Sequence, residues 1–525
     1  MIVIFNDSPQ YPNRSVGAYR IATVLRRHGL NVEVIDYLHK WETAHIKNIP
    51  YPEHLFDYLD KIPNVEWWGF SGKFLSAFST ISKNQFPGLK QQTKIEGHFT
   101  KCSMEFENKL IQYIQNRGGP VVVGGPATDV LKIYCEESNI EQDYKKTDFP
   151  LNEKIDILCE GYADVGVIAI HEHIMNNAEL KYTDLNGVKV VNCDTDYNNI
   201  DLATLDTEYD YSDFLLEGEI FPIEISRGCI FHCAFCSFGH LGKKPGTYIR
   251  PKESIKKDIV DRYEKYGTTR FLFVDDTFND SVEKMKIIKE IRDETGIPFE
   301  FWSYCRLDLL RAKPEMVDLI DQIGWTSFTF GVETFNQASG KDVKKGADPE
   351  KLKDFLITLR ERFPTNKFHI NFIVGLPSDT EEEITKSVQW FIDNPNVATN
   401  LTIRELNIHN ARHKRTASLI AQNPESYGYT VTKSNSNPSL VKWVTKTGMT
   451  LHAATKISKH LQEKYYLSKG KSVTPITVMM DNILDVDETG MLVNNQKEVV
   501  SIYLSKKRKY RKSYPKNIKK YNIKG

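Results

Sequence analysis

Short apolar runs alternate with segments of helical spacing along the first third of the chain. Uninterrupted apolar runs predict strands at residues 1–6, 31–37, 65–72, 120–126 and 154–161. Apolar residues recur with helical spacing in residues 17–29, 106–118 and 163–176. Five apolar strands joined by crossovers predict a doubly wound parallel sheet, and we assign residues 1–193 to this Rossmann-type domain.

A second alternation follows an acidic linker at residues 194–220. Its strands are predicted at residues 221–226, 269–275, 299–306, 325–331, 367–375 and 400–406. Its helices are predicted at residues 252–267, 281–296, 313–324, 348–363 and 379–394, the last two opening on Asp348 and Asp379 as N-caps. Six βα units are too few to close an eight-stranded barrel, so residues 221–404 are predicted to form an open (β/α)6 partial barrel.

The remaining segments follow the barrel. For residues 405–500 we predict a small α-rich region that consists of a loop followed by a helix. We expect this region to cap the barrel and to help select the substrate. Residues 501–525 carry ten Lys or Arg and no Asp or Glu, although the whole chain has 69 of each charge. We expect a disordered basic tail or a clamp on the acidic body; nucleic-acid binding, with interleaved tyrosines for stacking, is the less favoured alternative.

The composition predicts an ordinary soluble protein. Hydrophobic residues make up 40% and charged residues 26% of the 525 residues. No apolar run approaches the ~18 residues that a membrane helix needs, and the first residues resemble a strand more than a signal peptide. The five cysteines outside one cluster show no regular spacing, which favours a reducing cytosol over a disulfide framework. A cytoplasmic location is therefore expected.

The cluster consists of Cys229, Cys233 and Cys236, in the loop after the first barrel strand. Cysteines three and four residues apart converge on one metal centre only where the backbone wraps around it. A structural zinc site would need a fourth ligand, such as His232 or His240. An iron–sulfur cluster with three cysteine ligands instead leaves one iron open.

Polar and glycine residues recur at the predicted strand ends, where sheets of both kinds place their ligands. In the barrel these are Asp275, Asp276, Arg306, Gly331, Glu333 and Gly375-Leu376-Pro377, and in the first domain Ser71, Gly124, Gly125, Glu160 and Gly161. The alternatives are structural: turn glycines, a surface salt bridge of Arg306, and helix capping by the two aspartates. Cys305 is most simply a buried thiol.

The cysteine loop, with Phe235 before its last cysteine, resembles that of the radical SAM superfamily. The stretches "FLFVDDTFND", "SYCRLD", "GVETFNQASGKDVKKGAD" and "INFIVGLPSDTEEEI" resemble strand-end motifs of the subgroup whose N-terminal domain binds cobalamin. The stretches "VVVGGPATD" and "ILCEGYAD" resemble that cobalamin-binding domain. The resemblance covers roughly residues 1–465.

The resemblance implies three cofactors. A 4Fe–4S cluster would be held by Cys229, Cys233 and Cys236, and its open iron would chelate S-adenosylmethionine (SAM). SAM would contact Phe235, Asp275, Asp276, Arg306, Glu333, Gly375 and Pro377. Cobalamin would bind at Ser71, Gly124, Gly125, Glu160 and Gly161. No D-x-H-x-x-G motif occurs, so the cobalt would have no histidine ligand.

The implied reaction is reductive SAM cleavage to a 5′-deoxyadenosyl radical, which needs an electron donor such as flavodoxin or ferredoxin. A cobalamin-dependent methyltransferase acting on an unactivated carbon of a small molecule or peptide is the preferred function. The alternatives are a cobalamin-independent radical rearrangement or oxidation, and a non-enzymatic iron–sulfur or cobalamin sensor. The lack of a further C-x-x-C pair disfavours methylthiotransferases and maturases with a second cluster.

Overall fold

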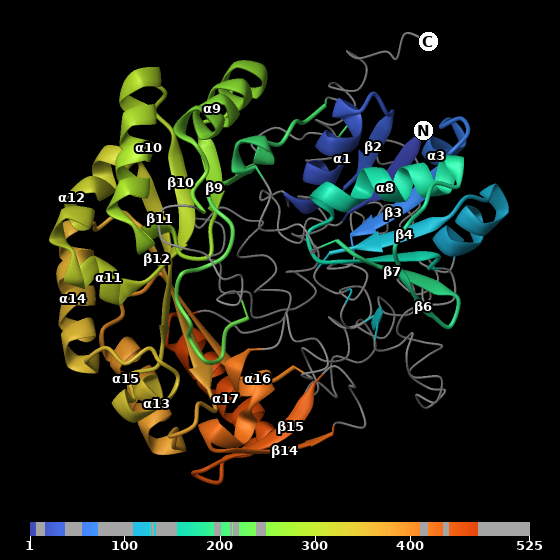
Figure 1. Cartoon of the computed structure of the whole chain (residues 1–525). Helices are drawn as coiled ribbons and strands as arrows, with labels where there is room; N and C mark the ends of the chain where they lie inside the picture. Colours follow the sequence, from blue (N-terminus) through green and yellow to red (C-terminus); the bar gives the residue numbers. More distant parts are fainter. Residues whose placement is uncertain are drawn as a thin grey trace. The chain divides into compact units, whose positions relative to one another are not determined.

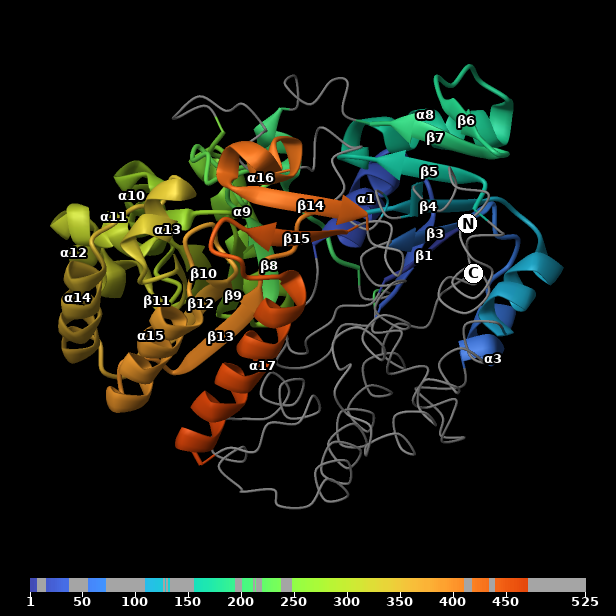
Figure 2. The same ribbon diagram turned by 90° about the horizontal axis from the view of Figure 1, so that it is seen from below.

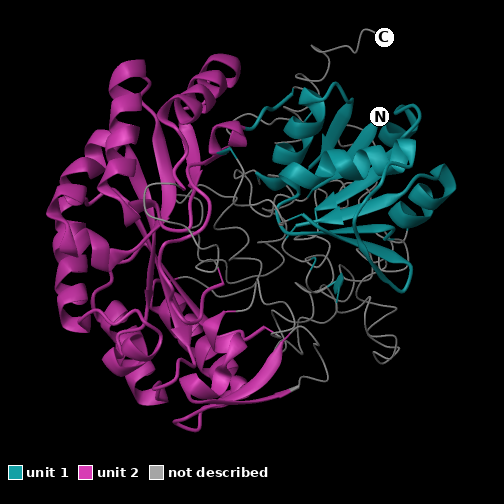
Figure 3. Cartoon of the chain, in the orientation of Figure 1, with its two compact units in different colours: residues 1–201, 207–219, 497–525 teal, residues 202–206, 220–496 magenta. Residues whose placement is uncertain are grey.

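A computed structural model of the chain is shown in Figure 1. The structure describes residues 1–6, 16–36, 55–71, 109–125, 128, 131–132, 155–193, 201–210, 213, 220–237, 248–409, 418–433 and 440–470. The predicted basic tail at 501–525, and most of the acidic linker, lie outside these residues. The described residues fall into two compact units (Figure 3), the first drawn from residues 1–201 and 207–219 and the second from residues 202–206 and 220–496.

The first unit is built on a seven-stranded sheet with the strand order β2-β1-β3-β4-β5-β7-β6. All neighbouring strands are parallel except β6 and β7. The strands are β1 (Ile2–Phe5), β2 (Val32–Ile35), β3 (Trp67–Ser71), β4 (Val121–Gly124), β5 (Ile157–Glu160), β6 (Thr183–Leu185) and β7 (Val188–Asn192). The helices include α1 (Gly17–Arg27), α3 (Leu55–Asp60) and α8 (Ala163–Asn176), and residues 109–117 are also helical. The five predicted strands are therefore confirmed, because short apolar runs are buried on both faces of a parallel sheet.

Strands β6 and β7 form a hairpin that was not predicted from the sequence. The turn is Asn186-Gly187, and both residues have positive φ angles, 54° and 91°. Asn-Gly between two short strands is the strongest local signal for such a turn, so the pattern was available in the sequence.

The second unit is built on a parallel six-stranded sheet with the order β13-β12-β11-β10-β9-β8. Its strands are β8 (Phe221–Glu224), β9 (Arg270–Val274), β10 (Glu300–Cys305), β11 (Trp325–Glu333), β12 (Lys367–Val374) and β13 (Asn400–Glu405). Neighbours in sequence are neighbours in the sheet, which confirms the predicted (β/α)6 partial barrel. Figure 1 shows helices along one face of this sheet; we call the opposite face the inner face.

The helices between these strands are α9 (Lys252–Tyr266), α10 (Val282–Thr295), α11 (Leu307–Ala312), α12 (Pro314–Ile323), α13 (Gln337–Asp342), α14 (Pro349–Arg362) and α15 (Glu381–Asp393), with the short 3-10 helices η3 (Leu202–Leu205) and η6 (Phe278–Asp280). Asp348 caps α14 as predicted, since its carboxylate accepts from the backbone N–H groups of Glu350 and Lys351. Asp379 does not cap α15. Thr380 does so instead, and the Asp379 carboxylate accepts from Leu376 N.

The region after the barrel contains α16 (Leu419–Gln422), η7 (Pro424–Tyr427), β14 (Tyr429–Lys433), β15 (Val441–Thr445) and α17 (Leu451–Ser468). Helix α17 confirms the second part of the helix that we predicted over residues 439–466, but the first part of that stretch is wrong. It forms β15, which pairs antiparallel with β14, a strand in the segment where we expected a loop (Figure 2). Helix α17 closes the edge of the sheet, because Gln462 bonds both Ile403 N and Leu401 O of β13. No helix in the described part of the chain is long and apolar enough to span a membrane.

Candidate functional site

The carboxyl ends of β8 to β13 lie at one edge of the parallel sheet, and this edge collects the residues that the sequence singled out. The cysteine loop follows β8, Asp275 and Asp276 follow β9, and Arg306 follows β10. Glu333 ends β11, and Gly375 follows β12. Parallel pairing therefore brings residues that are far apart in sequence to one rim.

The three cysteines differ in exposure. Cys229 and Cys233 are buried, each with 8% of its surface exposed, and Cys236 is half-buried. All three are free thiols. Among the described residues, no group of three or more His, Cys, Asp or Glu side chains is arranged to hold a metal ion, and this favours neither zinc nor an iron–sulfur cluster. His232 is exposed, and His240 lies outside the described residues.

The main chain of the loop is fixed from two sides at Ala234, between two of the cysteines. Its N–H donates to Val343 O (3.0 Å), and its carbonyl accepts from Ile420 N (2.9 Å). Val343 follows α13, and Ile420 belongs to α16 beyond the barrel. The cysteine loop is thus held by segments distant in sequence.

Hydrogen-bonding groups approach two of the sulfurs. Thr277 Oγ1 lies 3.4 Å from Cys229 Sγ, and the N–H of Phe231 donates to the same sulfur at 3.5 Å. Arg306 Nη1 donates to Cys233 Sγ at 3.5 Å. Burial raises the pKa of the Cys229 thiol, while the hydrogen bonds with Thr277 and Phe231 oppose the rise. Thiolate or cluster sulfur is what such donors stabilise, so the donor set fits an iron–sulfur cluster held by three cysteines.

Arg306 is half-buried and forms an ion pair with Asp308. Nε and Nη2 donate to the two carboxylate oxygens at 3.1 and 2.7 Å, and the guanidinium lies 4.2 Å from the ring centroid of Phe231. Burial alone would lower the pKa of Arg306, but hydrogen bonding and charge from Asp308 raise it above the ordinary value. Asp308, which the sequence pattern did not single out, therefore occupies the fork that we expected to bind the SAM carboxylate.

Asp275 lies beneath the loop, with 3% of its surface exposed. Its carboxylate accepts from Ser226 Oγ (2.8 Å), Lys284 Nζ (2.8 Å) and Thr277 N (2.9 Å). The helix-capping alternative is wrong for Asp275, because Ser281 caps α10. The neighbouring Asp276 is half-buried.

Glu333 occupies an unusual backbone position at the end of β11. Its φ is +69°, and the register with β12 shifts between Gly331 and Glu333. Its Oε1 accepts from Lys345 Nζ at 3.1 Å, and that ammonium lies 5.9 Å from the ring centroid of Phe235 in the cysteine loop. A Cβ at Gly331 would lie 2.5 Å from Glu333 Oε1 and 2.9 Å from Lys345 Nζ, so the glycine makes room for this pair.

Gly375 belongs to a tightly bonded turn before Pro377. Its N–H donates to Asp379 Oδ2 (3.0 Å), and its carbonyl accepts from Tyr429 OH (2.8 Å). Its φ is +97°, and a Cβ there would stand 2.2 Å from the indole of Trp443. Burial raises the pKa of Asp379 to about 6. Sequence reasoning gave Asp379 only as an N-cap and Trp443 only as a packing or surface residue, and it did not single out Tyr429, because no local pattern reveals their contacts with this turn.

The expected cobalamin residues lie at the carboxyl ends of β3, β4 and β5 in the first unit. Ser71 and Gly124 are paired neighbours, and Gly125 and Gly161 have φ of 105° and 84°. The Glu160 carboxylate accepts from Lys132 Nζ at 2.7 Å. The sequence also predicts a long polar loop with room for a broad ligand in "NDSPQYPNRSVGAYR", residues 6–20; residues 7–15 of it lie outside the described residues.

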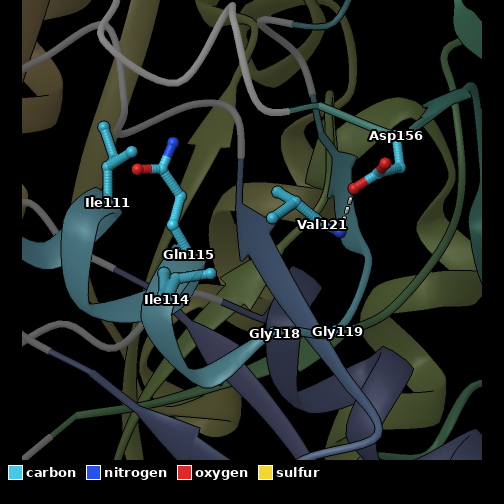
Figure 4. A pocket seen from close by; sticks show the side chains of 7 residues that line it. All are labelled: Ile111, Ile114, Gln115, Gly118, Gly119, Val121 and Asp156. Carbon is cyan, nitrogen blue, oxygen red and sulfur yellow. Dashed lines mark hydrogen bonds between the residues drawn. The ribbon is translucent and has the colours of Figure 1, made fainter.

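Figure 4 shows a pocket in the same unit. Its lining residues are Ile111, Ile114, Gln115, Gly118, Gly119, Val121 and Asp156. Val121 begins β4 and Asp156 precedes β5, so the pocket lies at the amino-terminal edge, opposite the expected cobalamin residues.

Comparisons with known proteins agree with this interpretation of the second unit. Residues 223–391 match the Radical SAM superfamily. An uncharacterised methyltransferase of Pyrococcus horikoshii is 25% identical over 171 residues, 31% of this chain and 35% of that protein. The ribosomal protein uS12 methylthiotransferase RimO of Thermotoga petrophila is 27% identical over 176 residues, 32% of this chain and 40% of that protein. The chain thus aligns with little more than a third of the length of these curated relatives.

The fold of the whole chain also has a solved counterpart. The radical SAM methyltransferase TsrM from Kitasatospora setae, with cobalamin and a 4Fe–4S cluster bound, superposes with a TM-score of 0.54 at 13% identity, covering 99% of both chains. At this identity the likeness concerns the fold. Residues 223–391 thus match the radical SAM superfamily, and the whole chain has a fold like that of TsrM.

Proposed function

We propose that this protein is a cobalamin-dependent radical SAM methyltransferase. The observation that carries the proposal is the loop of Cys229, Cys233 and Cys236 at the carboxyl end of β8, with donors directed at two of its sulfurs. When bound, the cluster supplies an electron and an open iron position to SAM, and cobalamin supplies the methyl group.

The rim residues have distinct tasks in this proposal. Arg306 places a half-buried positive charge beside Cys233, where it would offset the negative charge of the sulfurs. The pair of Lys345 and Glu333 presents one ammonium and one carboxylate at the end of β11, next to Phe235. A zwitterionic amino acid group, such as the methionyl end of SAM, matches an ammonium and a carboxylate placed together.

The first unit would bind cobalamin through its strand ends. Gly124 offers no side chain beyond β4, so the backbone there can approach a broad ligand. A Cβ at Gly124 meets nothing closer than Cys159 Cβ at 3.7 Å, so the glycine is not required by the protein's own packing. This open space on the ligand edge supports a close approach by a macrocycle.

The inner face of the barrel sheet supplies side chains for a substrate. Tyr304 is 47% exposed, and its ring lies 6.0 Å from that of Trp302, whose Nε1 donates to Thr329 Oγ1. His369 lies 6.5 Å from Trp302, and burial lowers its pKa to about 4. A neutral imidazole beside aromatic rings suits an uncharged, planar part of a substrate. The electron donor would be a flavodoxin or a ferredoxin.

Anaerobic reconstitution tests the proposal. We expect about four irons per chain, and, with dithionite, SAM and added cobalamin, both 5′-deoxyadenosine and S-adenosylhomocysteine. Cys233→Ala should lose the iron and SAM cleavage, whereas Cys193→Ala, in the first unit, should keep both. SAM with a deuterated methyl group, incubated with a small-molecule cell extract, would then show the product by its mass shift.

Two outcomes would contradict the proposal. Full occupancy by one zinc and no iron would exclude radical chemistry. Formation of 5′-deoxyadenosine alone, unaffected by cobalamin, would exclude methyl transfer and leave another radical reaction.

A further inference from the structure

A fully buried lysine lies beneath the cysteine loop. Lys284, on α10, has no exposed surface, and its Nζ lies 2.8 Å from Asp275 Oδ2, 2.8 Å from Asp280 Oδ1 and 3.1 Å from Thr277 O. Burial opposes its charge, but the two carboxylates raise the pKa of Lys284 above its ordinary value. The ammonium is therefore charged and tied to the segment between β9 and α10.

The two carboxylates hold both ends of the segment that carries the cysteines. Asp275 accepts from Ser226 Oγ at 2.8 Å, just before the loop. Asp280 accepts from Tyr248 OH, just after it. Ser226 also forms an isolated antiparallel bridge with Ile249. Ser226 and Tyr248 thus each donate a hydrogen bond to an aspartate that is ion-paired with Lys284.

The same segment reaches a sulfur directly. Asp275 Oδ1 accepts from Thr277 N (2.9 Å), which fixes the threonine whose Oγ1 lies 3.4 Å from Cys229 Sγ. That hydroxyl has one proton and two neighbours, Asp276 O at 2.7 Å and the sulfur. If Cys229 is a thiol, its S–H can donate to the Thr277 hydroxyl, which itself donates to Asp276 O. If the sulfur is a thiolate or is bound to a metal, it has no proton to donate, and the Thr277 hydroxyl donates to the sulfur instead.

Stability alone is a weak reason for such a network. The free energy lost by removing an ammonium and two carboxylates from water is about as large as the free energy gained from their attraction. A protein in which apolar side chains replace such a buried ionic group is often as stable. A buried ionic network that bonds residues before and after a loop does fix where the loop begins and ends. We infer that Lys284 is a positioning residue for the cysteine loop and that Thr277 hydrogen-bonds the Cys229 sulfur of the bound cluster; both inferences rest on the proposed function.

Lys284→Met tests the first part, with Lys289→Met as the matched control on the same helix, where Lys289 forms only an exposed pair with Asp293. Tyr248→Phe is a milder variant that removes one bond to Asp280 and leaves Lys284 in place. After anaerobic reconstitution, we expect Lys284→Met to lose iron to a chelator at least several-fold faster than the wild type, Tyr248→Phe to fall between them, and Lys289→Met to match the wild type.

Thr277→Val and Thr277→Ser test the second part. Hydrogen bonds to sulfur raise the reduction potential of a cluster. Thr277→Val should therefore keep its iron but shift the midpoint potential to more negative values and change the electron paramagnetic resonance spectrum, and Thr277→Ser should restore both.

The outcomes separate the two proposals. Wild-type protein without iron would contradict the proposed function. Wild-type protein with a cluster, together with unchanged chelator kinetics in folded Lys284→Met and Tyr248→Phe, would overturn the role of Lys284. An unchanged potential and spectrum in Thr277→Val would overturn the role of Thr277. Circular dichroism checks folding, and if Lys284→Met fails to fold, Tyr248→Phe decides.

Discussion

The indole of Trp443 occupies the space where a side chain at Gly375 would stand. The nearest ring atom would lie 2.2 Å from a Cβ, and φ of Gly375 is +97°. The pair joins the turn after β12 to β15, and Tyr429 OH adds a bond to the Gly375 carbonyl. The region beyond the barrel is thereby fastened to the rim.

Gly375→Ala should destabilise the second unit by about 3 kcal/mol or more, because backbone strain and a clash with Trp443 add together. Gly296→Ala is the control, since Gly296 has a φ of +64° but open space around its Cβ position, and about 1 kcal/mol is expected there. Denaturant unfolding measures both. Equal losses in the two variants would show that the contact with Trp443 is unimportant.

A pH-dependent stability is expected from Glu33. Burial, and then the charge of Asp213, raise its pKa to about 8, while Arg26 lowers it. The folded protein therefore binds a proton that the unfolded chain releases near pH 4.5, so stability falls as the pH rises from about 4.5 through 8, by at most about 1.4 kcal/mol per unit. Glu33→Gln should flatten this slope. An identical slope in wild type and variant would refute the assignment.

His369 should act in the opposite direction. Burial and Lys367 lower its pKa from 6.5 to about 4, so the unfolded chain binds the proton more tightly in that window. Stability should fall as the pH drops from about 6.5 toward 4, and His369→Gln should remove this contribution. Unfolding of wild type and variant at pH 5 and pH 7 provides the comparison; equal pH effects would argue against a buried neutral imidazole.

Arg306 should matter for SAM binding as well as for the sulfur beside it. In iron-loaded protein, Arg306→Gln should raise the Kd for SAM at least about tenfold, because the positive charge beside Cys233 is lost and Asp308, which fills the guanidinium fork, is left without its partner. Arg306→Lys should recover little, since an ammonium cannot bond Asp308 and Cys233 in the same geometry. Equilibrium dialysis measures the affinity. If Arg306→Gln binds SAM as tightly as the wild type, Arg306 has only a structural role and does not contribute to SAM binding.

Gly124 offers a test of cobalamin binding that spares the fold. The protein has room for a Cβ there, so Gly124→Ala and Gly124→Val should melt near the wild-type temperature. A ligand close to this backbone would lose that room, and cobalamin uptake should fall from Gly to Ala to Val. Undiminished uptake in Gly124→Val would place the macrocycle elsewhere.

Sequence reasoning succeeded where local pattern determines the outcome. Strands such as β9 and β12 follow from short apolar runs, and the rim follows from parallel pairing, which brings Arg306 and Glu333 to one edge. It failed where a side chain's role depends on contacts that no local sequence pattern encodes. Asp379 has the sequence of an N-cap, yet it accepts from Gly375 and Leu376 and leaves the cap to Thr380.

Lys284 shows the same limit. It lies at a helical position that periodicity assigns to no special role, and only the fold places it between two carboxylates. The role of Trp443 likewise depends on its contact with Gly375, which lies many residues earlier in the sequence.

The two bonds of Ala234 bear on the timing of biosynthesis. Val343 and Ile420, which bond its N–H and its carbonyl, leave the ribosome long after the cysteines do. When the nascent chain has left the ribosome only as far as Cys236, its three cysteines are present but the hydrogen bonds that fix the loop cannot yet form. Metal delivery that requires the finished loop would therefore be post-translational, and a truncated chain ending before Ile420 would be poorly loaded with iron.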